Sequence, residues 1–134
     1  MATENETLVR HAYEAYAAGD VAAMLRFVDA DLEWTYLDPA FEDPEPQVCH
    51  GTKELATALQ RQARRGLKSR LEEVHANGEL VMVAVHTPGL DALRARQGND
   101  RNYDVLTIRD GRIVAMRACR NRTEALEAAG VIGS

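Results

Sequence analysis

Cysteines, long apolar runs and positive charge are all scarce in this sequence, and each scarcity excludes a class of protein. The 134 residues include only two cysteines, Cys49 and Cys119, so a disulfide framework is not expected. No apolar run approaches the roughly 20 residues of a membrane-spanning helix, and the opening residues, MATENETL, lack the apolar core of a signal peptide. We therefore expect a reduced, cytoplasmic protein without a membrane partner.

The net charge of −5 argues against a nucleic-acid partner. One basic stretch, residues 61–70, is typical of the solvated C-terminal end of a helix. Glycine-rich phosphate loops and Gly-x-Ser-x-Gly elbows do not occur. Four histidines are scattered without a second ligand at metal spacing: His11, His50, His75 and His86. We expect neither a metal nor a cofactor.

The length, with 46% hydrophobic and 28% charged residues, predicts one domain, residues 1–134, with a single core or a modest cavity. Four segments have helical patterns. Thr3 and Glu6 have the form of a capping box for a first helix that ends near Gly19, and Asp20 can cap a short second helix through Val28. The third and fourth helices are predicted from Thr52 to Gly66 and from Asn121 to Ala129.

Four further runs have the period-two pattern of strands, and they interrupt or follow these helices. They are Leu32–Asp38, Ser69–Ala76, Glu79–Thr87 and the hairpin Tyr103–Arg120, with Asn77-Gly78 as a hairpin turn between the second and third. The segment 39–50 is predicted to be an irregular loop, and the polar insertion 88–101 either one helical turn or a loop. This order predicts an α+β fold whose curved antiparallel sheet leaves a concave space under the helices.

The hairpin YDVLTIRDGRIVAMRACR places one carboxylate, Asp104, on an otherwise apolar face. Its turn is either a two-residue Asp110-Gly111 loop or a three-residue loop with Gly111 as a bulge, and the two differ by one residue of register. The three-residue loop gives the cleaner separation of polar and apolar faces, so we favour it. Asp104 then shares a face with the following apolar residues: Leu106, Ile108, Val114, Met116 and Ala118.

Three segments together give the chain a resemblance to the nuclear transport factor 2-like superfamily, in its SnoaL-like and ketosteroid isomerase-like branch. They are AYEAYAAGDVAAMLRFVDADLEW, GTKEL and DVLTIRDGRIVAMRACRNRTEALEAAG. The resemblance implies a cone, a bent sheet wrapped around the N-terminal helices, with an apolar pocket at its wide end. It also implies a homodimer that pairs through the outer sheet face. The superfamily includes isomerases, cyclases, epoxide hydrolases and plain ligand binders, so the fold alone does not name a reaction.

The resemblance places Asp104 where the isomerases carry an aspartate in the oxyanion hole, a worked example of a carboxylic acid kept neutral by an apolar site. The tyrosine of that oxyanion hole falls on Ala12, one residue before Tyr13. The general base falls on Thr35 or Tyr36, neither of which is a carboxylate. Cyclases and epoxide hydrolases of the superfamily carry an acid where this chain has Ala118, and the hydrolases also an arginine at Asn102.

The candidate catalytic residues are therefore Asp104 with Tyr13 or Tyr16 as assisting hydroxyls, and Asp38 or His86 as base. Asp38 also fits a turn residue before Pro39, and His86 a histidine at the pocket rim. The candidate ligand-binding residues are Trp34, Tyr36, Met82, Leu106, Met116, Ala118 and Arg120.

Two hypotheses stay open for the function. The first is an isomerase-like or cyclase-like enzyme that moves a proton next to the carbonyl of a small apolar ligand, with epoxide hydrolysis less favoured. The second is a noncatalytic ligand-binding or dimeric interaction module. They differ in whether Asp104, a tyrosine hydroxyl and a second titratable group converge on one point.

Overall fold

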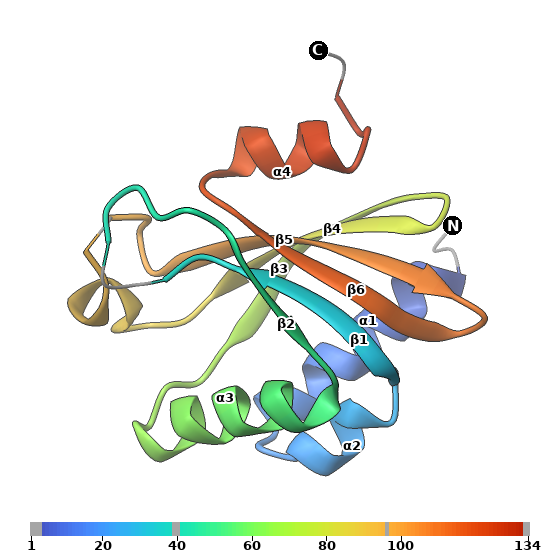
Figure 1. Cartoon of the computed structure of the whole chain (residues 1–134), viewed down its shortest axis with the longest axis horizontal. Helices are drawn as coiled ribbons and strands as arrows, with labels where there is room; N and C mark the ends of the chain where they lie inside the picture. The colour runs from blue at the N-terminus through green and yellow to red at the C-terminus, as the bar shows by residue number, and fades with distance from the viewer. Residues whose placement is uncertain (1–3, 39–40, 96, 133–134) are drawn as a thin grey trace.

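One six-stranded sheet forms the centre of the molecule, with strand order β2-β1-β6-β5-β4-β3. The computed structural model describes residues 4–38, 41–95 and 97–132. Three helices lie on one side of the sheet and the last helix on the other (Figure 1). The elements are α1 (Glu4–Ala17), α2 (Val21–Leu25), β1 (Val28–Tyr36), β2 (Gln47–His50), α3 (Thr52–Arg64), β3 (Arg70–Asn77), β4 (Leu80–His86), the 3₁₀ helix η1 (Leu90–Leu93), β5 (Arg101–Arg109), β6 (Arg112–Cys119) and α4 (Arg122–Ala128).

The α+β class is confirmed, but the sheet is mixed rather than antiparallel throughout, because β1 pairs with β6 in parallel. Two predicted helix caps are confirmed. The Asp20 carboxylate accepts a hydrogen bond from the Ala23 amide at 3.0 Å, and the Asn121 side chain accepts one from the Glu124 amide at 2.8 Å. The capping box predicted at Thr3 falls outside the described residues. No helix among the described residues is long and apolar enough to cross a membrane.

The N-terminal strands differ most from the sequence prediction. The second helix ends at Leu25, and Val28 opens β1 four residues before the predicted start of that strand. The segment predicted as a loop contains β2, which pairs antiparallel with β1. A four-residue strand at the sheet edge is too short for an extended alternation of polar and apolar residues. Only its pairing with β1 identifies it as a strand.

The β5–β6 hairpin combines features of both predicted registers. Asp110 and Gly111, with φ of 50° and 73°, form the two-residue loop, so the favoured three-residue loop is wrong. An irregularity at Val114 then shifts β6 by one residue, so that Asp104 pairs with Ala118 and Leu106 with Met116. Beyond this bulge the predicted face of Asp104 is correct for Met116 and Ala118, but nearer the turn Ile113 rather than Val114 lies opposite Ile108 on that face.

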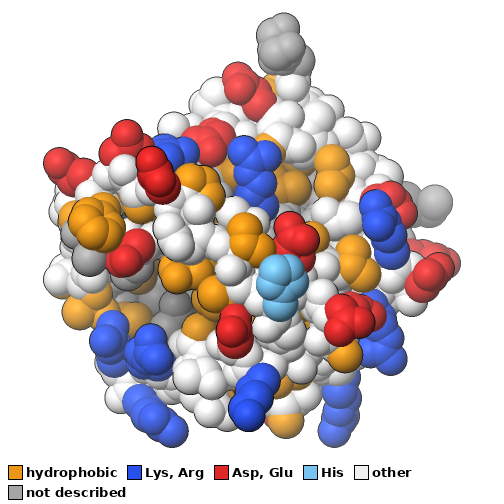
Figure 2. All heavy atoms as spheres, viewed as in Figure 1, with side chains coloured by type: hydrophobic (Ala, Val, Ile, Leu, Met, Phe, Trp, Pro, Cys, Tyr) orange, Lys and Arg blue, Asp and Glu red, His pale blue; other side chains and the backbone are white. Residues whose placement is uncertain are grey.

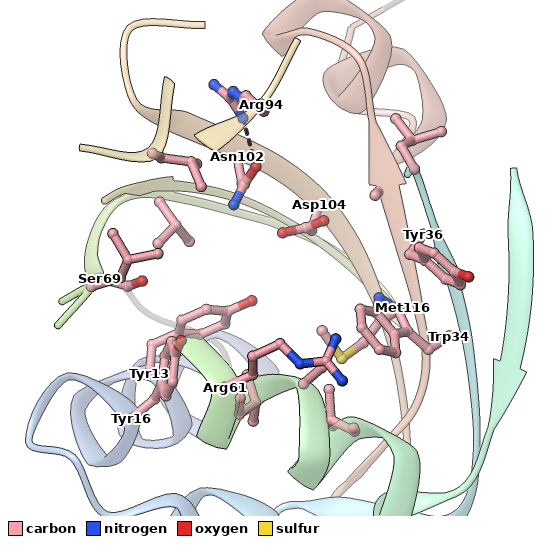
Figure 3. Close-up of a pocket in the computed structure, with 18 of the residues that line it drawn as sticks. Tyr13, Tyr16, Trp34, Tyr36, Arg61, Ser69, Arg94, Asn102, Asp104 and Met116 are labelled. Carbon is pink, nitrogen blue, oxygen red and sulfur yellow. Dashed lines mark hydrogen bonds between the residues drawn. The ribbon is translucent and has the colours of Figure 1, made fainter. Parts of the chain in front are cut away.

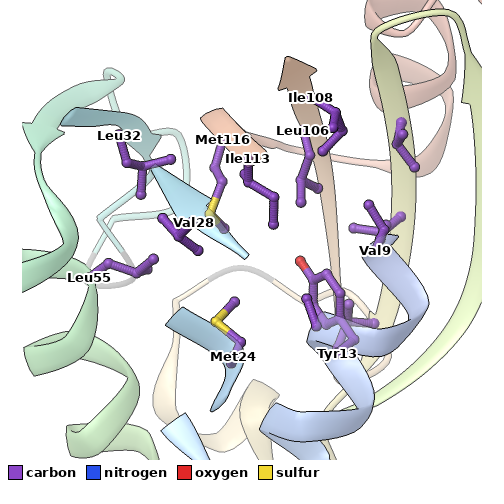
Figure 4. Packing of buried hydrophobic residues seen from close by; sticks show 14 residues of the cluster. Val9, Tyr13, Met24, Val28, Leu32, Leu55, Leu106, Ile108, Ile113 and Met116 are labelled. Carbon is purple, nitrogen blue, oxygen red and sulfur yellow. The ribbon is translucent and has the colours of Figure 1, made fainter. Parts of the chain in front are cut away.

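The second hairpin, between β3 and β4, is confirmed, with Asn77 paired to Leu80 and Gly78 in the left-handed region. The two faces of the sheet belong to two separate apolar clusters. The larger cluster lies between the inner sheet face and the first three helices and includes Val9, Met24, Leu32, Leu55 and Ile113 (Figure 4). The smaller one lies under α4 on the outer face and includes Met82, Ala84, Val105, Cys119 and Leu126.

Candidate functional site

A cavity of about 330 Å³ opens between the inner sheet face, α1, α3 and the segment around η1. This volume lies at the lower end of the range of small-molecule sites. The side chains around it come from opposite directions: two tyrosines from α1, an arginine from α3, Asp104 from β5 and aromatic rings from β1 (Figure 3). The cavity is mostly apolar, with few polar groups that converge.

Tyr13 and Tyr16 bring two phenols from one face of α1 into this cavity. Burial raises the pKa of Tyr13 well above its usual range, and the charges of Asp104 and then Tyr16 raise it further. Burial also raises the pKa of Tyr16, against a hydrogen bond with Ser69 that lowers it. Both phenols therefore stay protonated at neutral pH and can donate hydrogen bonds. Ala12, where the resemblance places the tyrosine, is fully buried in the core instead.

Asp104 is the only acidic side chain that lines this cavity among the described residues. The Asp104 carboxylate on β5 and the Tyr13 phenol on α1 both point into the cavity (Figure 3). An acid next to protonated phenols, inside an apolar wall, can exchange a proton with a ligand while the phenols hold an oxygen atom of that ligand.

The opposite wall is aromatic. The rings of Trp34 and Tyr36, on the inner face of β1, lie with centroids 5.3 Å apart and planes tilted by 41°. Met116 and Ala118 continue this wall on β6. All four side chains lie where the sequence analysis expects ligand-binding residues. They present an apolar and largely aromatic surface to the cavity.

The sequence analysis missed a buried arginine in the insertion. Arg94, just after η1, lines the cavity with a side chain only 4% exposed. Its Nε donates to Asp91 Oδ1 at 2.8 Å, and its Nη1 donates to Asn102 Oδ1 at 2.9 Å. Burial raises the pKa of Asp91, but the Gly98 and Asp100 amides and the Arg94 guanidinium outweigh it and lower that pKa. The insertion is thus part of the site, which its polar composition did not indicate.

A model of the SnoaL-like domain family matches residues 9–116 of this chain. The chain belongs to the SnoaL-like family. Among solved structures, it is similar to a nuclear transport factor 2-like protein of unknown function from Burkholderia pseudomallei, with 20% identity, 94% of this chain and 97% of that chain covered, and a TM-score of 0.65. No curated protein matches the chain significantly.

Two other solved structures support the same fold. A SnoaL-like protein of unknown function from Burkholderia thailandensis is 14% identical, with 89% and 98% of the two chains covered and a TM-score of 0.69. A candidate polyketide cyclase from Xanthomonas campestris is 23% identical, with 89% and 90% covered and a TM-score of 0.61. The predicted superfamily and its SnoaL-like branch are confirmed.

Five predicted residues of this SnoaL-like chain lie outside the cavity. Met82 belongs to the cluster under α4, and His86 shares its side of β4, whereas Val85 faces the cavity. Leu106 is fully buried in the core deeper along β5. Asp38 borders a separate surface pocket with Phe41 and Asp43. The Arg120 side chain lies outside the cavity, where its Nε donates a hydrogen bond to Asp43 Oδ1 at 2.9 Å.

The mouth of the cavity is basic on the side of α3. Arg61 and Arg65 both line it, whereas Arg64, on the same helical turn, does not. Basic side chains gather at the lower left of the molecular surface, near α3 (Figure 2). The predicted helix end is therefore solvated but also borders the site. No group of three metal-ligating side chains occurs in the described part of the chain.

Proposed function

We propose that this SnoaL-like protein binds a small apolar ligand with a carbonyl group in its cavity and transfers a proton next to that carbonyl, as an isomerase-type or cyclase-type enzyme does. The observation that carries the proposal is the buried Tyr13 phenol and the half-buried Asp104 carboxylate, which line the same mostly apolar cavity. Enolisation of a ketone needs a hydrogen-bond donor to the carbonyl oxygen and a base for the neighbouring carbon, and these two groups can supply both.

In the proposed step the Tyr13 and Tyr16 hydroxyls donate hydrogen bonds to the carbonyl oxygen. Asp104, as carboxylate, takes a proton from the carbon next to the carbonyl. The electron pair of that C–H bond forms the enolate, whose oxygen is held by the phenols. The protonated Asp104 then returns the proton to the same or another carbon. Asp104 takes the role of base because Asp38 and His86 do not line the cavity.

The test uses 1-tetralone, a bicyclic ketone, with Trp34 as the reporter of binding. Trp34 is the only tryptophan and it lines the cavity, so its fluorescence reports a bound ring directly. We expect the Asp104→Asn variant to abolish exchange of the ketone's α-protons in D₂O while Trp34 still reports binding. Asp38→Asn is the matched control, because that carboxylate lies outside the cavity. Equal exchange by wild type and Asp104→Asn would overturn the proposal.

A second candidate is a noncatalytic ligand binder. The observation that favours it is that Asp104 is the single carboxylate in the cavity among the described residues, with no histidine beside it. Quenching of Trp34 fluorescence by ketones without any proton exchange supports this candidate over the enzyme. Epoxide hydrolysis is the weakest candidate, because Ala118 and Asn102 stand where hydrolases of the superfamily carry an acid and an arginine.

We also propose a homodimer that pairs through the outer sheet face. Helix α4 covers this face over β4, β5 and β6, so the available part is nearer β1 and β2. There Val48 on β2 is 52% exposed, and the proposed dimer would cover it. Sedimentation at micromolar concentration should give a dimer that Val48→Asp dissociates, and a monomer for the wild type would remove the proposal.

A further inference from the structure

The Asn102 side chain has a fixed orientation in the cavity wall. Its Oδ1 accepts a hydrogen bond from Arg94 Nη1 at 2.9 Å. A guanidinium carries only donors, so the atom that faces it must be the amide oxygen. The NH₂ group of Asn102 therefore points the other way, toward the cavity (Figure 3). Among the described residues it has no hydrogen-bond acceptor.

The Arg94 guanidinium, which orients Asn102, is itself held by several contacts. Arg94 donates from Nε to Asp91 Oδ1 at 2.8 Å and from Nη2 to the Arg101 carbonyl at 2.8 Å. The Asp91 carboxylate also accepts from the Gly98 amide at 3.1 Å. A Cβ at Gly98 would overlap Arg94 Nη2, so glycine there leaves the room that the guanidinium occupies. The hydrogen bonds to Asp91 and to the Arg101 carbonyl hold the Arg94 guanidinium in the orientation in which Nη1 faces Asn102.

Asn102 and Asp104 lie two residues apart on β5 and both line the cavity. Two residues of a strand span roughly 6.6 Å, which is similar to the separation of two oxygen atoms on opposite carbons of a six-membered ring. The tyrosines and Asp104 thus act on one side of a ring, and the Asn102 amide offers a donor on the other side.

We infer that Asn102 is a specificity-determining residue that donates a hydrogen bond to a second oxygen of the ligand, and that Arg94 is its positioning residue. The ligand class is then a small ring ketone with a hydroxyl or second carbonyl across the ring from the reacting carbonyl. This inference rests on the proposed function, since it assumes that the first carbonyl lies at Tyr13 and Asp104.

The experiment compares 1-tetralone with 4-hydroxy-1-tetralone, which carries one more oxygen across the ring. Affinity is measured by Trp34 fluorescence in wild type and in Asn102→Leu, which is close to asparagine in size but lacks the amide. We expect the extra hydroxyl to improve wild-type affinity about 5-fold, the size of one net hydrogen bond, and to give no improvement in Asn102→Leu. Asn102→Leu should weaken the binding of 4-hydroxy-1-tetralone more than that of 1-tetralone. Thr107→Val, on the outer face of β5, is the matched control.

A second arm tests the positioning role without a ligand. We expect one sharp pair of Asn102 side-chain amide signals in ¹⁵N NMR of the wild type. Arg94→Lys, which keeps the charge but not the fork of donors, should broaden or shift them and reduce the gain from the hydroxyl. A thermal melt checks that each variant is folded. If 1-tetralone exchanges its α-protons through Asp104 and the hydroxyl gain is the same in wild type and Asn102→Leu, the inference fails alone. If neither ketone binds, the proposed function fails and the inference with it.

Discussion

Gly98→Ala should destabilise this protein through one side chain, that of Arg94. The added methyl would overlap Arg94 Nη2 and lie 3.3 Å from Arg94 Cζ and 3.4 Å from the Arg101 carbonyl oxygen. Arg94 would have to leave a position in which it donates to Asp91, Asn102 and Arg101. Backbone strain plays no part, because Gly98 is not among the glycines with positive φ.

The size of the effect follows from these contacts. Overpacking of this kind costs about 1–3 kcal/mol, and each hydrogen bond to a charged group that is lost adds to it. Replacement of glycine by alanine also restricts the unfolded chain, which returns about 0.4–1 kcal/mol. We expect a net loss of about 2 kcal/mol in the free energy of unfolding, or a fall in Tm of roughly 8 °C for a chain of this size.

Urea unfolding of a double-mutant cycle with Arg94→Met is the assay. Without the guanidinium the overlap disappears, so Gly98→Ala should be neutral or stabilising by about 0.5 kcal/mol in the Arg94→Met background. Gly66→Ala is the control, since its φ of +74° makes alanine unfavourable whatever residue 94 is. The same loss from Gly98→Ala in both backgrounds would refute the reasoning.

Three further predictions concern the outer face and its helix. The hydrogen bonds from Arg122 hold the pKa of Glu73 at about 2, against its burial and with help from His75. A lowered pKa stabilises the fold above the unfolded value of about 4.5 and loses that stability as the pH falls toward 2. Glu73→Gln should therefore lower the free energy of unfolding by about 1 kcal/mol at pH 7 and by almost nothing at pH 2. The value at pH 7 allows for the solvent screening of this partly exposed pair. An equal loss at both pH values in urea titrations would contradict this. Burial raises the pKa of the Cys119 thiol to about 11, so iodoacetamide at pH 8 should label Cys49 first, as read by mass spectrometry, and equal rates would contradict this burial. Asn121→Ala should lower the free energy of unfolding by about 1 kcal/mol in urea titrations and Asn121→Ser by much less, whereas equal losses would exclude a capping role.

The sequence predicted the part of the site that depends on local pattern. Alternation along β5 and β6 placed Asp104, Met116 and Ala118 on one face, and helical spacing put Tyr13 and Tyr16 together. The predicted register was wrong next to the turn and correct beyond Val114, because a bulge at Val114 restored the offset that the turn did not supply.

The rest of the site depends on contacts that no local pattern encodes. β4 is apolar on both faces, so its alternation could not tell that Val85 rather than Met82 and His86 faces the cavity. Nothing in the local sequence distinguished Arg94 from the other charged residues of the polar insertion 88–101. Its role follows from Asn102, which lies eight residues away on the next strand.

Exchange of the α-protons of 1-tetralone in D₂O, followed by ¹H NMR, tests the central claim most directly. Because Asp104 and the Tyr13 phenol line the same cavity, we expect the wild type to speed the exchange and Asp104→Asn to abolish it. Tyr13→Phe should slow it by about 10²-fold, the usual cost of one lost oxyanion donor. Binding of the ketone, reported by Trp34, with an exchange rate no faster than in buffer would contradict the claim and leave a ligand-binding protein without acid–base chemistry.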